Sequence, residues 1–262
     1  MTLNKASQAL GRLLRYVRSP NRQIQDLRRV FCRRHVRCVQ RSAINGEVKV
    51  VERGRERLLL LDNRCHSFGM THGSDAELYR EYWGHLHRTP FAVAPQPRVL
   101  MCGLGGGTGL KVLAKELQPR SITVIELDPV IIDVAQRHFD VERIPGLQIL
   151  AGDAQQRAQE LGARAERFDL VVEDAMCLPT MADAAAAMAQ LQRLAALLAP
   201  GGSLVLNAPI VSRERDTARV AAFTARLREL GMTVDTTDAG QRWWFNRMVY
   251  AQPRSGRVAQ AA

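Results

Sequence analysis

The sequence lacks the long apolar stretches that would place it in or across a membrane. No apolar run approaches the roughly 18 residues that a membrane-spanning helix needs, and the N-terminus has no apolar core of a secretory signal. The chain also contains no internal repeats, which argues against a solenoid or propeller. These absences lead us to expect a cytoplasmic protein without a membrane span.

The cysteines and histidines show no metal-binding or disulfide pattern. The five cysteines are scattered, and no two of them form a Cys-x-x-Cys pair. An odd, unpaired set predicts reduced thiols rather than a disulfide framework or a zinc site. His85 and His87 form a pair, with His66 and His72 upstream, but no carboxylate or thiol accompanies them at a ligand spacing. We therefore predict no metal.

The positive charge is confined to the N-terminus. Of the net charge of +11, residues 1–41 contribute +10, because they hold eleven basic residues against the single acid Asp26. Apolar residues at helical spacing predict a solvated helical arm here. Alternatives are contact of the arginines with nucleic acid or anionic lipid, and an organelle transit peptide. Aromatic side chains do not interleave with the charges, which disfavours an RNA-binding pattern.

Strands alternate with helices from residue 98 onward. The pattern predicts strands at residues 98–103, 121–127, 147–152, 168–174 and 203–209, and helices at residues 109–117, 129–139, 181–199 and 215–230. Such alternation predicts a doubly wound, mainly parallel sheet covered on both faces. Two β-rich runs, 232–237 and 243–252, predict an antiparallel pair at its edge.

The region before this α/β pattern is smaller. Two β-rich runs at residues 47–51 and 56–63 flank Gly54 and predict a hairpin. A loop at 66–76 and a helix at 76–89 are expected next. We divide the chain into units at residues 1–41 (basic arm), 42–74 (small β-hairpin unit and loop), 75–252 (α/β domain) and 253–262 (flexible tail).

The stretch VLMCGLGGGTGL, residues 99–110, is unusually rich in glycine and follows the first predicted strand. Ligands in doubly wound folds bind outside the carboxyl ends of the strands, which is where Gly103, Gly105 and Gly107 fall. The next strand ends at Glu126, 19 residues past Gly107. A carboxylate at that place can accept hydrogen bonds from both hydroxyls of a ribose.

The ligand class can be narrowed further. No frame of the glycines fits the Gly-x-Gly-x-x-Gly dinucleotide fingerprint, and there is no Gly-Lys-Ser/Thr of a P-loop. The third strand ends in Ala151-Gly152-Asp153-Ala154, where an acid can accept from an exocyclic amine such as that of adenine. These features predict a nucleoside without a phosphate chain. Capping of the following helices is the alternative explanation for the strand-end carboxylates.

Taken in order, VLMCGLGGGTGL, VIELDP, AGDA and VVEDA resemble the S-adenosylmethionine-binding fold of class I methyltransferases, and within it the spermidine-synthase-like branch. The resemblance spans about residues 47–208. It implies that the glycines admit the amino-acid part of the donor, that Glu126 holds the ribose, and that Asp153 and Ala154 lie at the adenine. It also implies that Asp174 is a catalytic aspartate and that Tyr79 lines the active site.

Three departures from spermidine synthases bear on the reaction. Gly106 stands where that family has an aspartate that binds the amine of the decarboxylated donor, and Cys177 stands in place of a second aspartate. A tyrosine–proline element late in the chain has no match. A polyamine site needs several carboxylates, because desolvating a multiply charged cation is costly.

We therefore expect methyl transfer from S-adenosylmethionine to an unidentified nucleophilic acceptor. Aminopropyl transfer to a polyamine from decarboxylated S-adenosylmethionine is the alternative, and a catalytically inactive nucleoside-binding module is a second. Further partners considered are an anionic molecule bound by the arginine-rich arm and a second copy of the chain in a homodimer.

Overall fold

The computed structural model describes residues 34–175, 184–210, 213–240 and 246–254, and they form two β-sheets. The N-terminal sheet is antiparallel and consists of β1 (Arg34–Ser42), β2 (Gly46–Arg53), β3 (Glu56–Leu61) and β4 (Arg64–Met70). The second sheet consists of β5 (Arg98–Cys102), β6 (Ser121–Glu126), β7 (Leu147–Ala151), β8 (Phe168–Glu173), β9 (Leu198–Pro209), β10 (Met232–Ala239) and β11 (Asn246–Pro253).

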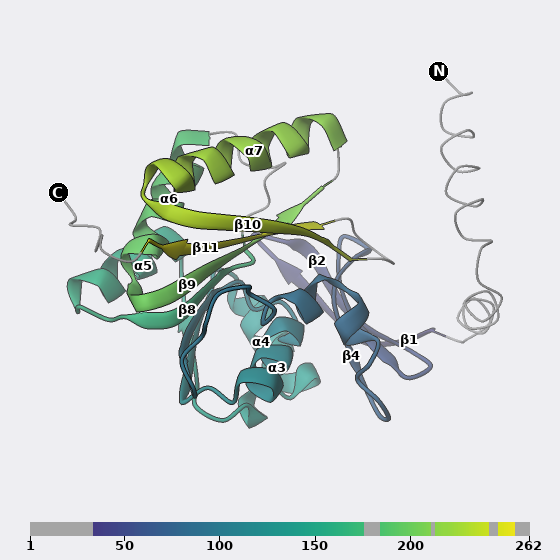
Figure 1. The fold of residues 1–262 in the computed structure, drawn as a ribbon. Coiled ribbons are helices and arrows are strands. Elements are labelled where there is room, and N and C mark those ends of the chain that lie inside the picture. Colours follow the sequence, from purple (N-terminus) through teal and green to yellow (C-terminus); the bar gives the residue numbers. More distant parts are fainter. Residues whose placement is uncertain (1–33, 176–183, 211–212, 241–245, 255–262) are drawn as a thin grey trace, which may run out of the picture.

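The seven-stranded sheet confirms the predicted doubly wound architecture. Its strand order is β10-β11-β9-β8-β5-β6-β7, with β5 to β9 parallel and β10 and β11 antiparallel at one end. One face carries α3 (Thr108–Leu117) and α4 (Pro129–Phe139), and the other carries α5 (Ala154–Ala163), α6 (Ala184–Ala196) and α7 (Arg213–Glu229). Figure 1 shows α7 lying along β10.

The central strand β5 shows why the sequence forms this sheet. Val99 and Met101 pack into the core on the α3/α4 face, and Leu100 and Cys102 pack into the core on the opposite face. A strand buried on both faces needs a continuous apolar run, and this is the pattern of parallel sheets covered by helices.

Of the helices in the described ranges, none is long and apolar enough to cross a membrane.

Asp128 joins the N-terminal sheet to the α/β domain. One carboxylate oxygen accepts from the backbone N–H of Val130 at 2.9 Å and caps α4, which begins with proline. The other oxygen accepts from the Ser42 hydroxyl and from the Asn45 amide, the latter at 2.7 Å. The side chain is 1% exposed, so these partners cannot be replaced by water.

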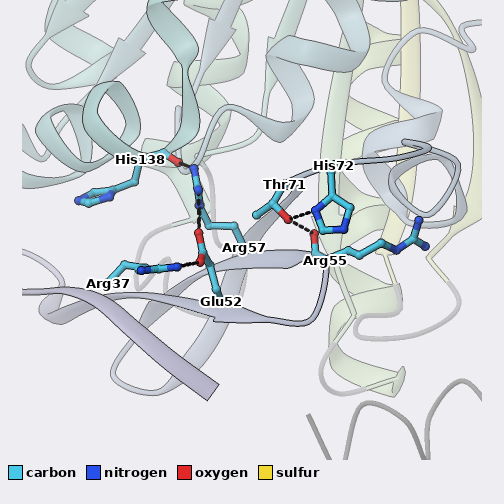
Figure 2. Close-up of polar contacts among 7 residues, drawn as sticks. All are labelled: Arg37, Glu52, Arg55, Arg57, Thr71, His72 and His138. Atoms are coloured by element: carbon cyan, nitrogen blue, oxygen red, sulfur yellow. Dashed lines mark hydrogen bonds and ion pairs between the residues drawn. The ribbon is translucent and has the colours of Figure 1, made fainter. Parts of the chain in front are cut away.

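A second contact between the two parts lies at the other end of α4. Arg57 on β3 donates to the backbone carbonyl of His138 and forms an ion pair with Glu52 at 2.7 Å (Figure 2). Arg37 on β1 also pairs with Glu52, at 2.6 Å. The guanidinium groups of Arg57 and Arg37 lower the pKa of Glu52 and outweigh the desolvation that raises it.

Figure 2 also shows the hydrogen bonds of the Thr71 hydroxyl to the His72 ring and to the Arg55 carbonyl, which measure 3.0 Å and 3.1 Å.

We expect Asp128→Ala to lower the free energy of unfolding by about 2–4 kcal/mol, because it removes a helix cap and leaves buried partners of the carboxylate unpaired. Denaturant unfolding monitored by circular dichroism measures this loss. Asp133→Ala is the matched control on the same helix, because the Asp133 carboxylate contacts Gln40 and Arg137 nearer the protein surface. An equal loss in both variants would contradict the special role of Asp128.

The predictions for the N-terminal region need correction. The helical arm was wrong for residues 34–41, because Arg34–Ser42 pairs with β2 as strand β1; residues 1–33 lie outside the described ranges. The hairpin of β2 and β3 is confirmed, with Gly54 at a φ of +60° in its turn. The loop prediction was wrong for residues 66–70, which belong to strand β4.

The helix predicted at residues 76–89 was also wrong. Two short 3₁₀ helices, η1 (Leu78–Arg80) and η2 (Tyr82–His85), stand there, separated by Glu81 in an extended conformation. Leu78, Trp83 and Leu86 are buried, so the apolar residues of this segment pack into the core without a continuous α-helix. A Cβ on Gly84 would lie 2.6 Å from the Cα of Tyr79, so the close packing of the two turns requires glycine at this position.

The other predicted helices and strands largely match the observed ones. The predicted helix 181–199 is helical at Ala184–Ala196, while Leu198 and Ala199 already belong to β9; residues 176–183 lie outside the description. Helix α5 was not among the predicted helices. The antiparallel pair at the sheet edge is confirmed by the ladder between β10 and β11.

Candidate functional site

The carboxyl ends of four parallel strands lie level with one another. Cys102 at the end of β5 pairs with Ile125 on β6 and with Glu173 on β8, and Glu126 pairs with Ala151 on β7. The residues that follow these ends therefore meet along one edge of the sheet. The chain continues from β5 to β6 and β7 on one side and returns to β8 on the other, so this edge is the topological switch point where doubly wound folds bind ligands.

The glycine loop crosses this edge and packs closely on the protein itself. Gly103 has a φ of +93°, and a Cβ there would lie 3.0 Å from the backbone nitrogen of Ala175. Gly107 has a φ of +71° at the start of α3, and a Cβ there would overlap Val141. Both positions need glycine for backbone conformation and protein packing. At Gly105 the nearest atom is 3.5 Å away, an ordinary contact, so approach of a donor to these glycines stays a prediction.

Glu126 holds the glycine loop in place. Its Oε2 accepts from the backbone N–H of Leu104 at 3.0 Å, and its Oε1 accepts from that of Asp128 at 2.9 Å. A carboxylate has about four acceptor positions, so these two bonds leave capacity for the hydroxyls of a ribose. The carboxylate does not cap α4, because Asp128 performs that function. The capping explanation thus fails for Glu126.

Asp153 does cap the next helix. Its Oδ1 accepts from the backbone N–H groups of Gln155 at 2.9 Å and Gln156 at 3.0 Å, and Ala154 is the first residue of α5. The capping explanation therefore holds for this carboxylate. Its Oδ2 lies on an exposed side chain at the same sheet edge, and a role at an adenine amine stays a prediction.

Asp174 follows β8 and lies in a hydrogen-bonded group of side chains. Its Oδ1 accepts from the Asn207 amide at 2.6 Å, and its Oδ2 accepts from the Tyr82 hydroxyl at 3.2 Å. Desolvation raises the pKa of Asp174 from 3.8 to about 7, and the hydrogen bonds from Asn207 and Tyr82 offset part of that rise. A carboxyl group that titrates near neutral pH is suited to accept a proton from a substrate.

The tyrosine beside Asp174 is Tyr82 rather than Tyr79. The Tyr79 hydroxyl donates to Glu116 on α3 at 2.6 Å, and desolvation together with that carboxylate raises its pKa to about 12. Tyr82 is 8% exposed, and its burial and the nearby Asp174 raise its pKa well above the usual value. Asp174 is thus contacted by Tyr82, and the prediction that Tyr79 lines the active site stays a prediction.

Sequence reasoning missed three members of this group, namely Tyr82, Asn207 and Asn246. Asn207 follows an apolar run inside β9, two residues before the strand ends at Pro209, and a polar residue after an apolar run is the same signal that marked Asp174. Asn246 donates to Asn207 at 2.7 Å, but it comes from β11, and the sequence gives no sign of that pairing.

Cys177 lies outside the described residues. Within the described ranges, no group of three or more His, Cys, Asp or Glu side chains could hold a metal ion.

Comparison with known sequences finds related domains. A family profile described as a methyltransferase domain matches residues 99–202. The polyamine aminopropyltransferase of Vibrio vulnificus (strain CMCP6) is 31% identical over 126 residues, which cover 44% of this chain and 42% of that protein. The eEF1A lysine and N-terminal methyltransferase of Danio rerio is 34% identical over 119 residues, covering 42% and 17%. The matched region therefore spans less than half the length of these relatives.

Comparison with solved structures extends the likeness over more of the fold. Spermidine synthase from Thermotoga maritima superposes with a TM-score of 0.62 at 15% identity, covering 84% of this chain and 73% of that one. Human methyltransferase-like protein 13, solved in complex with SAH, superposes with a TM-score of 0.50 at 18% identity, covering 70% and 81%. At such identities the likeness establishes the fold alone.

Proposed function

Starting from the class I S-adenosylmethionine-dependent methyltransferase fold of this chain, we propose that it transfers a methyl group from S-adenosylmethionine to a nucleophilic acceptor. The bound donor supplies an activated methyl group on a sulfonium. The protein then has to bind the donor, orient the acceptor for in-line attack and receive a proton.

The observation that carries the proposal is the packing around Gly106. A Cβ at this position would lie 3.0 Å from the ring of Phe139 and 3.1 Å from the Ser67 hydroxyl. Phe139 is 2% exposed and Ser67 is also 2% exposed, so neither can move aside easily. Spermidine synthases have an aspartate at the matching place that binds the amine of the decarboxylated donor. A side chain at position 106 would require Phe139 or Ser67 to shift, so the loop is packed tightly for glycine, which favours the carboxylated donor.

The described residues can be given roles in this reaction. Glu126 would hold the ribose of the donor, and Asp153 would hold the adenine amine. The glycine loop would lie next to the methionine end of the donor. Asp174 would accept the acceptor's proton, since its backbone lies beside Gly103 at the switch point and its carboxylate is held by Asn207 and Tyr82. The acceptor would lie between this carboxylate and the donor's methyl group.

Aminopropyl transfer is the second candidate. It is supported by the sequence similarity to a polyamine aminopropyltransferase and by superposition on a spermidine synthase over 84% of this chain. The two candidates differ in the donor that the protein prefers. Donor preference is therefore the property to measure before any acceptor is known.

We expect Gly106→Asp to destabilise the protein by about 1–3 kcal/mol without creating a preference for the decarboxylated donor, because the new side chain must displace Phe139 or Ser67. Denaturant unfolding and calorimetric titration measure the two effects. Gly162→Asp is the control, since a Cβ there would meet only Leu197, at an ordinary 3.7 Å. A stable Gly106→Asp protein that gains tight binding of decarboxylated donor would contradict the argument from packing.

Calorimetric titration of the parent protein with each donor separates the proposals. Methyl transfer is supported if S-adenosylmethionine binds more tightly and is then converted to S-adenosylhomocysteine. The acceptors for this conversion are tested as a panel of amines, hydroxyl compounds, thiols and carboxylates. Tighter binding of the decarboxylated donor, with turnover on polyamines, supports aminopropyl transfer instead. Binding of a donor without turnover on any acceptor would indicate an inactive nucleoside-binding module.

A further inference from the structure

Two buried asparagines form a chain of hydrogen bonds that ends at Asp174. Asn246 donates from Nδ2 to Oδ1 of Asn207 at 2.7 Å, and Asn207 donates from Nδ2 to Oδ1 of Asp174 at 2.6 Å. Asn207 is 4% exposed and Asn246 is 3% exposed. Asn246 lies on β11, Asn207 on β9, and Asp174 directly follows β8; these three strands are consecutive in the sheet.

The direction of this chain follows from the chemistry of its members. An ionised carboxylate only accepts hydrogen bonds, so Asn207 must turn its NH₂ group toward Asp174. The carbonyl oxygen of Asn207 then faces away and needs a donor, which is the NH₂ group of Asn246. If Asn207 were reversed, its carbonyl would face Asp174 and would favour the protonated carboxyl group.

We propose that Asn246 is a positioning residue that locks the Asn207 amide with its NH₂ group toward Asp174 and so keeps this carboxylate ionised and oriented. The catalytic importance of that effect rests on the proposed function, but the effect on Asp174 itself does not. Asn246 acts through Asn207 and does not contact Asp174 directly.

Among the residues that the structure describes, the other groups beside Asp174 do not account for the same effect. Tyr82 on η2 is the titratable side chain that contacts it, and its hydroxyl can either donate to the ionised carboxylate or accept from the protonated form. The neighbouring Glu173 accepts from the backbone N–H of Ala175 at 3.0 Å, and this bond directs one of its oxygens to the backbone. Asn207, whose carbonyl oxygen accepts from Asn246, presents its NH₂ group to Asp174 and donates to it.

The test is a double-mutant cycle read by the titration of Asp174 itself. Protein labelled with ¹³C at aspartate carboxyl carbons is titrated by NMR, and the Asp174 signal is assigned by its loss in Asp174→Asn. The variants are Asn246→Leu, Asn207→Leu and the double variant. Gln252→Leu is the control, because this amide lies on the same strand but donates to the carbonyl of Gly201 at 2.7 Å.

We expect the Asn207→Leu variant to raise the titration midpoint of Asp174 by about one pH unit, and the Asn246→Leu variant by about half a unit. In the Asn207→Leu background, Asn246→Leu should add no further shift, because its intermediary is gone. The control should leave the midpoint unchanged. Asn246→Ala, which adds no bulk, should repeat the result of Asn246→Leu and guards against a folding defect of the latter.

An unchanged midpoint in both Asn246 variants would overturn the proposal. So would a shift that persists in full in the Asn207→Leu background, because Asn246 would then act by general packing. The readout needs neither donor nor acceptor. A failure of the proposed methyl transfer would therefore leave these titrations unaffected, and the two ideas can fail separately.

Discussion

Asp174→Asn is expected to lower the rate of group transfer about 10²–10⁴-fold, the typical contribution of a positioned general base, while donor binding stays within about twofold of the parent. The amide has nearly the same shape and can still accept from Asn207, but it cannot take up a proton. The measurement is formation of S-adenosylhomocysteine with the acceptor found in the panel, together with calorimetric titration of the donor.

The pH dependence provides an independent check of the same role. Because the pKa of Asp174 is raised to about 7, the parent should lose activity as the pH falls through 7 and should reach a plateau above it. A carboxyl group with a raised pKa in the folded state binds its proton more tightly there than in the unfolded chain. Its ionisation therefore opposes folding at pH 8, and Asp174→Asn should unfold at a denaturant concentration no lower than the parent.

Asp169→Asn is the matched control on the same strand, since its carboxylate lies at the opposite end of β8 and accepts from the backbone N–H of Arg98 at 2.7 Å. It should change the rate by less than about twofold at pH 8. An Asp174→Asn enzyme that retains parental turnover would exclude Asp174 as the general base. A flat pH profile of the parent between 6 and 8 (about one unit on either side of the midpoint) would show that titration of Asp174 does not control the rate.

Glu126→Ala is expected to weaken donor binding about 100-fold or more. The change removes an ionised acceptor for the two ribose hydroxyls, and each hydrogen bond to a charged group contributes roughly 1.5–3 kcal/mol. It also releases the backbone N–H of Leu104, which the carboxylate now holds in the glycine loop. Calorimetric titration with S-adenosylmethionine measures the loss.

Two further variants separate these contributions. Glu126→Gln keeps one acceptor oxygen and should lie between the parent and the alanine variant. Glu142→Ala, on the exposed side of the short η3 helix (Val141–Arg143), should bind the donor like the parent. Donor binding that is unchanged in Glu126→Ala would show that this carboxylate serves the loop alone.

The α/β core could be predicted from the sequence because each of its signals is local. Helix α4 matches its predicted range because Asp128 and Pro129 mark its start, and an apolar stripe runs to Phe139. The parallel strands are apolar runs bounded by glycine or a carboxylate, and these boundaries also located Glu126, Asp153 and Asp174.

The remaining parts depend on contacts between residues distant in sequence. The sequence pointed to Tyr79, but the hydroxyl that contacts Asp174 is that of Tyr82, which follows the extended backbone at Glu81. The role of Asn246 depends on the insertion of β11 between β9 and β10. Strand β1 was hidden in an arginine-rich segment, because an exposed edge strand carries charge where a buried strand carries apolar residues.

The position of β11 has a consequence for biosynthesis. Strand β9 leaves the ribosome some forty residues before β11, yet β11 is its neighbour on one side of the sheet. A nascent chain therefore presents the unpaired backbone edge of β9 until residues 246–253 have emerged. A chain that stops before this strand would leave β9 with an open edge that can pair with other chains, so we expect such truncated chains to aggregate.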